Sequence, residues 1–151
     1  MKENNKIGEQ MSCELPTVNA NKDEMKAIFE SVKTIAIPGL SPDESKPSHR
    51  VAKYLQSQGF KIIPIYPKEE TILGEKVYRS LAEIEEKIDM VDMFRKAEVA
   101  DSIVDVLAKR DDVKVLWLQE GIVNNEAAKR AQNMGLTVVQ SRCTMVEHKA
   151  L

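Results

Sequence analysis

Several features are scarce in this chain, and their scarcity narrows the class of protein. It has only two cysteines, Cys13 in a polar leader and Cys143 beyond an expected strand, so a structural disulfide is not expected. No apolar run approaches the length of a membrane span, and the first residues lack the apolar core of a signal peptide. We therefore expect a cytoplasmic protein in a reducing compartment, with no membrane partner.

A basic surplus is also missing. The chain carries 22 Lys and Arg against 24 Asp and Glu, a formal net charge of -2, which does not favour general binding to nucleic acid. Its 151 residues are 42% hydrophobic, enough for one domain with a substantial core. Residues 1–20 are polar and non-periodic and contain Pro16. We expect a flexible leader over residues 1–20 and a single domain over residues 21–151.

The stretch from Thr34 to Pro42 organises the rest of the chain. An apolar run ends at Pro38, Gly39 follows, and a helical pattern opens near Ser48, which we expect to be the N-cap. This is the pattern of a βαβ unit, whose strand end and helix N-terminus can hold a phosphate. The missing N–H of Pro38 places it at the very end of its strand.

The strand-then-helix alternation continues downstream, and it predicts an α/β fold with a doubly wound, mainly parallel sheet flanked by helices. A short strand is expected near residues 74–78 at the sheet edge. The other expected strands lie at 34–38, 61–66, 113–118 and 137–140, with one more within 88–94 that starts near Met90. Helices are expected over 21–31, 48–58, 98–110 and 124–134.

The first turn does not carry a nicotinamide or flavin fingerprint. That fingerprint needs three spaced glycines, and Gly39 is the only glycine between the strand and the helix. After the second strand the first charged residue is Lys68, which favours a phosphorylated ribose over a free 2′-hydroxyl. An ordinary βα turn at Gly39 and a solvated loop lysine at Lys68 remain open at this point.

Several loops should meet at the carboxyl ends of the strands, where parallel sheets bind their ligands. Their basic members fit an anionic, phosphorylated ligand, and their cysteine faces the same crevice. The candidate ligand-binding residues are Gly39, Leu40, Ser41, Arg50, Pro67, Lys68, Phe94, Arg95, Gln119, Glu120, Gly121, Arg142 and Cys143.

Catalytic and metal-binding patterns are weak. Asp89 and Asp92 are three apart in a strand and point to opposite faces, so we expect no metal site, and we expect Asp92 to make a local hydrogen bond or salt bridge. Neither His49 nor His148 has an acid and a nucleophile at a recognisable spacing. The sequence therefore predicts no catalytic residues.

The ordered set of motifs resembles a known family, the small stand-alone CoA-binding proteins, whose domain is similar to the CoA-binding domain of the succinyl-CoA synthetase alpha subunit. The resemblance covers residues 25–148. The segments that carry it are Gly39–Pro42, Lys46–Leu55, Gly59–Pro67, Leu73–Tyr78, Val91–Arg95, Trp117–Gly121 and Ser141–Cys143.

The resemblance implies a Rossmann-like fold with strand order 3-2-1-4-5-6, the third strand lying around Val77. It implies that the turn Gly39–Ser41 holds the CoA pyrophosphate and that Lys68 lies near the adenosine 3′-phosphate. Phe94 and Arg95 resemble the segment beside the adenine, and Gln119–Gly121 resembles the segment along the pantetheine arm.

The resemblance also implies that Cys143 lies near the CoA thiol. A thiolate beside Arg142 at a strand-to-helix turn would react readily, so we consider a mixed disulfide with CoA. Two positions depart from the family pattern, Pro38 before the glycine and Thr144 where proline is common.

The interpretation that follows is non-catalytic binding of coenzyme A or an acyl-CoA. An NAD(P)-binding oxidoreductase and a protein-interaction module are the alternatives. A homodimer is compatible with a domain of this kind and size.

Overall fold

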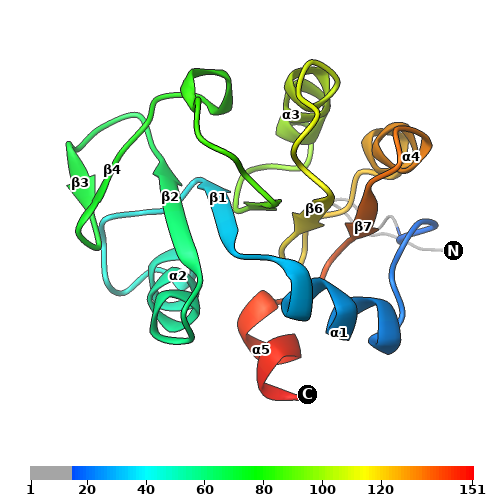
Figure 1. Ribbon diagram of the computed structural model, residues 1–151, viewed down its shortest axis with the longest axis horizontal. Helices are drawn as coiled ribbons and strands as arrows, with labels where there is room; N and C mark the ends of the chain where they lie inside the picture. The colour runs from blue at the N-terminus through cyan, green and yellow to red at the C-terminus, as the bar shows by residue number, and fades with distance from the viewer. Residues whose placement is uncertain (1–14) are drawn as a thin grey trace, which may run out of the picture.

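A computed structural model describes residues 15–151, which form a five-stranded sheet with helices on both faces (Figure 1). One face is covered by α3 (Val99–Leu107) and α4 (Asn125–Asn133), and the other by α1 (Lys22–Ser31), α2 (Pro47–Ser57) and α5 (Thr144–Lys149). All neighbouring strands run parallel. In spatial order they are β2 (Lys61–Ile65), β1 (Thr34–Pro38), β5 (Met90–Met93), β6 (Val115–Leu118) and β7 (Thr137–Val139).

This architecture confirms the predicted α/β, Rossmann-like fold. The expected third strand is the exception, because around Val77 only Tyr78 joins the sheet, through one parallel bridge to Ile65. The short strands β3 (Thr71–Ile72) and β4 (Glu75–Lys76) instead pair with each other, antiparallel, in a separate hairpin. The order of the remaining strands is the predicted one.

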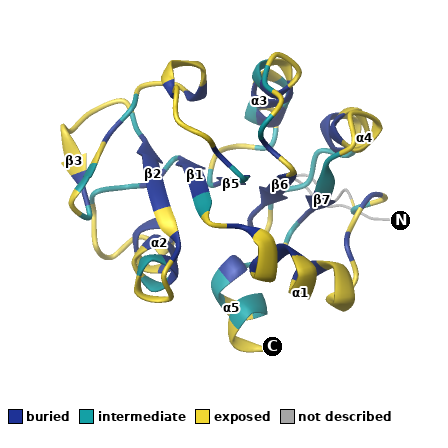
Figure 2. Ribbon diagram, in the orientation of Figure 1, coloured by how far each residue is buried: buried dark blue, intermediate teal, exposed yellow. Residues whose placement is uncertain are grey.

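The core lies in two layers, one on each face of the sheet. The strands are almost wholly buried, which explains why they appear as continuous apolar runs in the sequence (Figure 2). Trp117 of β6 packs against Phe29 of α1, with ring centroids 5.4 Å apart. Helix α1 is capped by Asn21 and Glu24, whose side chains accept each other's backbone N–H at 2.8 and 2.9 Å.

Helix α5 was implied only by the strand-to-helix turn expected at Cys143, and no residue range was predicted for it. It is six residues long, too short for a helical period to stand out in the sequence. Its His148 bonds the Tyr54 hydroxyl at 2.6 Å and lies edge-on to Phe29 and Phe60, so the helix is fixed to α1 and α2 by an aromatic cluster.

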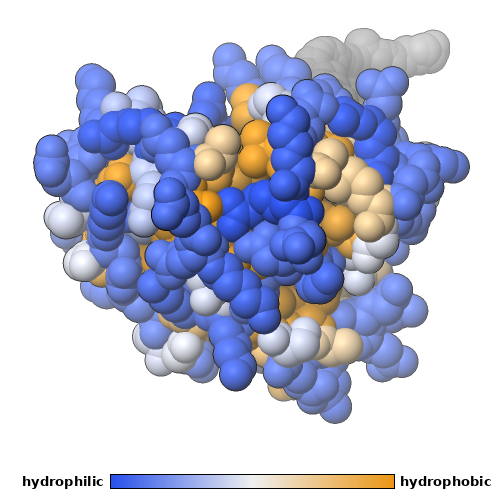
Figure 3. Space-filling view, turned by 45° about the horizontal axis from the view of Figure 1, so that its top comes forward, coloured by the Kyte–Doolittle hydropathy of each residue, from blue (hydrophilic) through white to orange (hydrophobic). Residues whose placement is uncertain are grey.

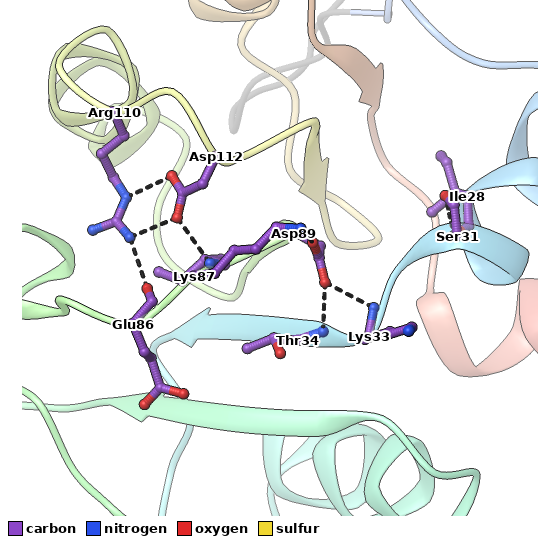
Figure 4. Close-up of polar contacts among 10 residues, drawn as sticks. Ile28, Ser31, Lys33, Thr34, Glu86, Lys87, Asp89, Arg110 and Asp112 are labelled. Carbon is purple, nitrogen blue, oxygen red and sulfur yellow. Dashed lines mark hydrogen bonds and ion pairs between the residues drawn. The ribbon is translucent and has the colours of Figure 1, made fainter.

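At the amino ends of the strands, carboxylates hold the incoming backbone (Figure 4). Asp89 Oδ2 accepts the N–H groups of Lys33 and Thr34, both at 2.9 Å, where β1 begins. Asp112 pairs with Arg110 at 2.8 Å, and this pairing lowers the pKa of the Asp112 carboxyl to about 2. These groups are therefore occupied in fixing the end of the sheet opposite to the predicted site.

Part of the expected leader packs against the sheet. Val18 and Ala20 are buried, and Asn19 exchanges two hydrogen bonds with the backbone of Gln140, at 2.9 and 3.1 Å. This segment is therefore bound to the residue that directly follows β7. Residues 1–14, including Cys13, lie outside the described residues. Within residues 15–151, no helix has the length and apolar character needed to cross a membrane.

Candidate functional site

A cavity of about 600 Å³ opens at the carboxyl ends of the strands. The loops after β1, β2, β5, β6 and β7 all contribute to its wall. A smaller cavity of about 360 Å³ adjoins it and shares Gly39, Tyr66 and Phe94. The wall of the larger cavity is formed by Gly39, Ser41, Lys46, Pro47, Ser48, Val51, Tyr66, Phe94, Gln119, Glu120, Ile122 and Cys143.

Another hollow, of about 650 Å³, lies at the amino ends of the strands. Charged side chains line it, and among them Arg110 and Asp112 already form hydrogen bonds with each other. The carboxyl-end cavity is the better candidate because it is less polar and lies where parallel sheets bind ligands.

Gly39 lies in the walls of both cavities. Its φ of +85° is in the left-handed region, and a Cβ built on it would lie 2.4 Å from the Phe94 carbonyl oxygen. Only glycine therefore allows the loop after β5 to approach the loop after β1. The Gly39 N–H donates to Ile65 O at 2.9 Å, so it extends the sheet and does not face a ligand.

The loop from Leu40 to Lys46 is held by the first turn of α2. The Ser41 N–H donates to Ser48 Oγ at 3.0 Å, and His49, buried beside it, donates from Nδ1 to Ser41 O at 3.0 Å. Ser48 is thus not the N-cap. That position is taken by Lys46, and Pro47 begins the helix.

The N-terminus of α2 is open toward the cavity. Lys46 makes no side-chain capping bond, and Lys46, Pro47 and Ser48 all line the wall. Within residues 15–151 the Ser48 N–H meets no acceptor. An uncapped helix N-terminus with a lysine beside it is a favourable place for an anion.

The smaller cavity is flanked by cationic and apolar side chains. Pro67, Phe94, Arg79 and Arg95 line it. Arg79 Nη1 donates to the carbonyls of Tyr66 and Lys68 at 3.0 and 2.9 Å, which fixes the backbone after β2. An aromatic ring and a guanidinium at the mouth of one cavity suit a flat heterocycle with a phosphate near it.

At the opposite end, the turn that carries Cys143 is tied to β6. Trp117 Nε1 donates to Arg142 O at 2.8 Å, and the Gly121 N–H donates to Ser141 Oγ at 3.1 Å. Ser141 adopts a φ of +57°, an uncommon conformation for a residue with a side chain. The half-buried Cys143 thiol is held in this way at the cavity wall.

Asp92 lies beneath this turn, fully buried in β5. Its Oδ2 lies 3.0 Å from Thr144 Oγ1, so the expected hydrogen bond is present but its partner is 52 residues away and not local. Its Oδ1 has no partner among the described residues. Burial raises the pKa of the Asp92 carboxyl to about 8, against a smaller lowering by the Thr144 hydrogen bond. At neutral pH this carboxyl is therefore mostly protonated.

The structure brings together most, but not all, of the predicted site residues. Six of them line the larger cavity: Gly39, Ser41, Phe94, Gln119, Glu120 and Cys143. Pro67 and Arg95 line the smaller one.

The others do not line either cavity. Leu40 is fully buried in the core, and Arg50 is exposed, with its guanidinium donating to Ser45 O at 2.6 Å. Lys68, Gly121 and Arg142 are exposed on the flanking loops. Lys46, Ser48, Tyr66, Arg79 and Ile122 were missed as site residues. The Lys-Pro pair at a helix start was a usable signal for Lys46.

Comparisons with known proteins show the family of the chain. The family model described as the CoA binding domain matches residues 33–149. The chain belongs to this family. Uncharacterized protein YneT of Bacillus subtilis (strain 168) is 38% identical over 130 residues, which cover 86% of this chain and 96% of YneT. The solved structure of a hypothetical protein from Pyrococcus horikoshii OT3 is 35% identical, with a TM-score of 0.84, over 93% of this chain and 99% of that one.

The CoA-binding domain also occurs within larger proteins. The ADP-forming acetate–CoA ligase of Methanocaldococcus jannaschii is 40% identical over 58 residues, which are 38% of this chain and only 8% of the ligase. The acetyl-coenzyme A synthetase 1 of Ca. Korarchaeum cryptofilum shares the fold, at 24% identity and a TM-score of 0.58, over 70% of this chain and 25% of that one. The family resemblance drawn from the sequence is thereby confirmed.

A first prediction concerns Gly39. Gly39→Ala should lower the free energy of unfolding by about 2 kcal/mol or more, because it combines the left-handed φ with overlap of the Phe94 carbonyl. Gly59→Ala is the matched control, since Gly59 has a φ of +97° but no atom within 4 Å of its built Cβ. Urea unfolding of both variants should show the larger loss at Gly39, and equal losses would contradict the close approach.

A second prediction concerns Asp92. Since its folded pKa is raised from 3.8 to about 8, its contribution to stability is complete below pH 4 and declines as the pH rises to about 8. At about 1.4 kcal/mol per pKa unit, the decline amounts to several kcal/mol. Asp92→Asn cannot ionise, so its free energy of unfolding relative to wild type should increase between pH 4 and pH 8. A difference that does not change over this range would contradict the raised pKa.

Proposed function

We propose that this CoA-binding domain binds coenzyme A, or an acyl derivative, and does not itself catalyse a reaction. The observation that carries the proposal is the pair of joined cavities, with an uncapped helix N-terminus at one side and the Cys143 thiol at the other. A nucleotide with a long arm that ends in sulfur suits a site of this shape. The membership of the CoA-binding domain family supports the same ligand.

The pyrophosphate would lie at the loop Gly39–Ser41 and the first turn of α2. The N–H groups of Gly39 and Ser41 are taken by Ile65 O and Ser48 Oγ. The negative charge of the pyrophosphate would therefore be bound by Lys46, by the Ser48 N–H and by the positive end of the helix dipole. Leu40 would contribute only by anchoring the loop in the core, and the exposed Arg50 would add long-range attraction.

The adenosine end would occupy the smaller cavity. Phe94 and Pro67 offer apolar surface for a base, and Arg95 lies beside them. Lys68, exposed one residue beyond Pro67, would approach a 3′-phosphate from the rim. Gln119, Glu120 and Gly121, together with Ile122, would then follow the arm toward Cys143 and Arg142.

The absence of catalysis is inferred from how the histidines are used. The Nδ1 of His49 is engaged by Ser41 O, and that of His148 by the Tyr54 hydroxyl within an aromatic cluster. Neither lines the cavity walls. The cavity walls therefore contain no histidine among residues 15–151, and Cys143 provides their one thiol.

An interaction module is less well supported. On the face presented in Figure 3, hydrophilic side chains predominate and apolar atoms form small separate patches. Among residues 15–151, only Leu15, Met134, Val146 and Leu151 are large apolar residues with high exposure.

Calorimetric titration of the reduced protein with CoA, dephospho-CoA and NADP tests the proposal. CoA should bind at micromolar concentration, and loss of its 3′-phosphate should weaken binding about tenfold, since a charge-assisted contact contributes roughly 1.5 kcal/mol. Lys68→Ala and Arg95→Ala should each reduce the preference for CoA over dephospho-CoA.

Lys114→Ala is the control for these charge changes, because this exposed lysine precedes β6 at the opposite end of the sheet. Its affinity should equal that of wild type. No heat of binding with CoA at millimolar concentration would refute the proposal. Binding of NADP as tight as that of CoA would favour the nicotinamide alternative instead.

We further propose that Cys143 can form a disulfide with CoA. The Cys143 thiolate attacks one sulfur of oxidised CoA, a Cys143–CoA bond forms as the S–S bond breaks, and the other CoA leaves as a thiolate. The exchange needs no oxidant beyond the CoA disulfide itself. The half-buried thiol at the cavity wall supports this step.

Mass spectrometry after brief treatment with limiting oxidised CoA tests the link. Wild type and Cys13→Ser should each gain the mass of one CoA less two hydrogens, and a reductant should remove it. Cys143→Ser should remain unmodified over the same time. Equally fast modification of Cys143→Ser would show that the cavity does not direct the exchange.

A further inference from the structure

A chain of three buried polar side chains runs from the core of the sheet to the cavity. Thr144 Oγ1 lies 3.0 Å from Asp92 Oδ2 and 2.9 Å from Gln119 Oε1. The Thr144 backbone N–H donates to the same Gln119 oxygen at 3.1 Å. Asp92 and Thr144 are fully buried, and Gln119 is 5% exposed. Of the three, only Gln119 lines the cavity that is proposed to bind CoA.

Hydrogen-bond chemistry fixes the direction of this chain. The backbone N–H of Thr144 can only donate, so the Gln119 atom that it meets must be the carboxamide oxygen. That oxygen can only accept, so the contact with Thr144 Oγ1 requires the hydroxyl proton to point at Gln119. Thr144 then has no proton left for Asp92, and Asp92 must supply the proton between them. The carboxyl is therefore the donor at the start of the chain.

The state of Asp92 agrees with this assignment. A carboxylate would leave Oδ1 charged, buried and without a partner among the described residues. Burial alone raises its pKa, and no charged side chain of β5, β6 or α5 adds to that effect. A neutral carboxyl is the form that both the geometry and the burial favour.

The chain determines which end of the Gln119 amide faces the ligand. With its oxygen bound inward to Thr144, the amide presents its Nε2 and two N–H donors toward the cavity that Gln119 lines. Thr144 directly follows Cys143, so these donors lie in the same wall as the thiol. Groups that can only donate select for an acceptor.

We propose that Gln119 Nε2 donates to a carbonyl oxygen of the bound ligand close to its sulfur, and that Asp92 and Thr144 are positioning residues that hold this amide in the donating orientation. The inference rests on the proposed binding of CoA and deepens it. The carbonyl is either an amide of the pantetheine arm or the thioester of an acyl-CoA.

The first test uses the protein without ligand, so that it does not depend on CoA binding. The ¹⁵N–¹H resonances of the Gln119 side chain, assigned by their absence in Gln119→Leu, should be dispersed in wild type and in Thr144→Ser, which keeps the hydroxyl. They should collapse toward the other glutamines in Thr144→Val. The ¹³C shift of the Asp92 carboxyl should report the protonated form at pH 6. An ionised Asp92, or a Gln119 resonance that is the same in Thr144→Ser and Thr144→Val, would overturn the inference.

The second test is calorimetry with CoA and acetyl-CoA. Thr144→Val and Gln119→Leu should weaken binding about fivefold, the usual effect of one hydrogen bond. Thr144→Ser and Asp92→Asn should stay within about twofold of wild type, because an asparagine Nδ2 still donates to Thr144 Oγ1. A loss with both ligands identifies an amide carbonyl, and a loss with acetyl-CoA alone identifies the thioester.

The two proposals fail in different ways. If wild type binds neither ligand, the proposed function is wrong, and the spectra of the free protein still decide whether the chain exists. If wild type binds CoA but Thr144→Val and Gln119→Leu bind it and acetyl-CoA equally well, the function stands and the carbonyl contact is refuted. Should Thr144→Val fail to fold, Gln119→Leu and the Asp92 carboxyl shift decide the question.

Discussion

The close approach of the β1 and β5 loops is the constraint on which the site depends. In the strand order β2-β1-β5, the chain leaves β1 toward α2 on one face and leaves β5 toward α3 on the other. The two loops therefore diverge and open a crevice at this switch point. Gly39 lets the Phe94 carbonyl come within 2.4 Å of where a Cβ would be, which closes the floor of the crevice without filling it.

The two ends of the site differ in how they handle charge. On the side proposed to hold the nucleotide, positive charge comes from Lys46, Arg79, Arg95 and the open start of α2. Among residues 15–151, the exposed Glu120 is the one carboxylate in the two cavity walls. On the side that holds Cys143, Asp92 is buried and neutral, and its hydrogen bond joins it to the neutral Thr144 hydroxyl. A ligand with phosphates at one end and an uncharged arm at the other matches this gradient.

The sequence was sufficient for the five parallel strands, their order and the first four α-helices, because fully buried parallel strands and amphipathic helices carry strong periodic signals. It did not predict the β3-β4 hairpin in place of a third strand, nor the range of the short helix α5. It was less informative where a residue has two partners to choose from. Ser48 looks like an N-cap, yet its hydroxyl accepts the Ser41 N–H, and the N-cap lies two residues earlier, at Lys46. The role of Asp92 depends on Thr144, 52 residues away, and no local pattern indicates such a contact.

The departure at Pro38 shows how the fold can tolerate a missing donor. Pro38 ends β1, and its carbonyl accepts the Phe94 N–H at 2.9 Å. The next N–H, that of Gly39, donates to Ile65 O. The turn after β1 therefore joins strands on both sides and leaves little of its own backbone for a ligand. Because the anion-binding groups come from α2 and from basic side chains, a proline at the strand end removes no donor from the cavity wall. The same reasoning explains why one glycine is enough here, whereas a loop that binds phosphate through its own amides needs several.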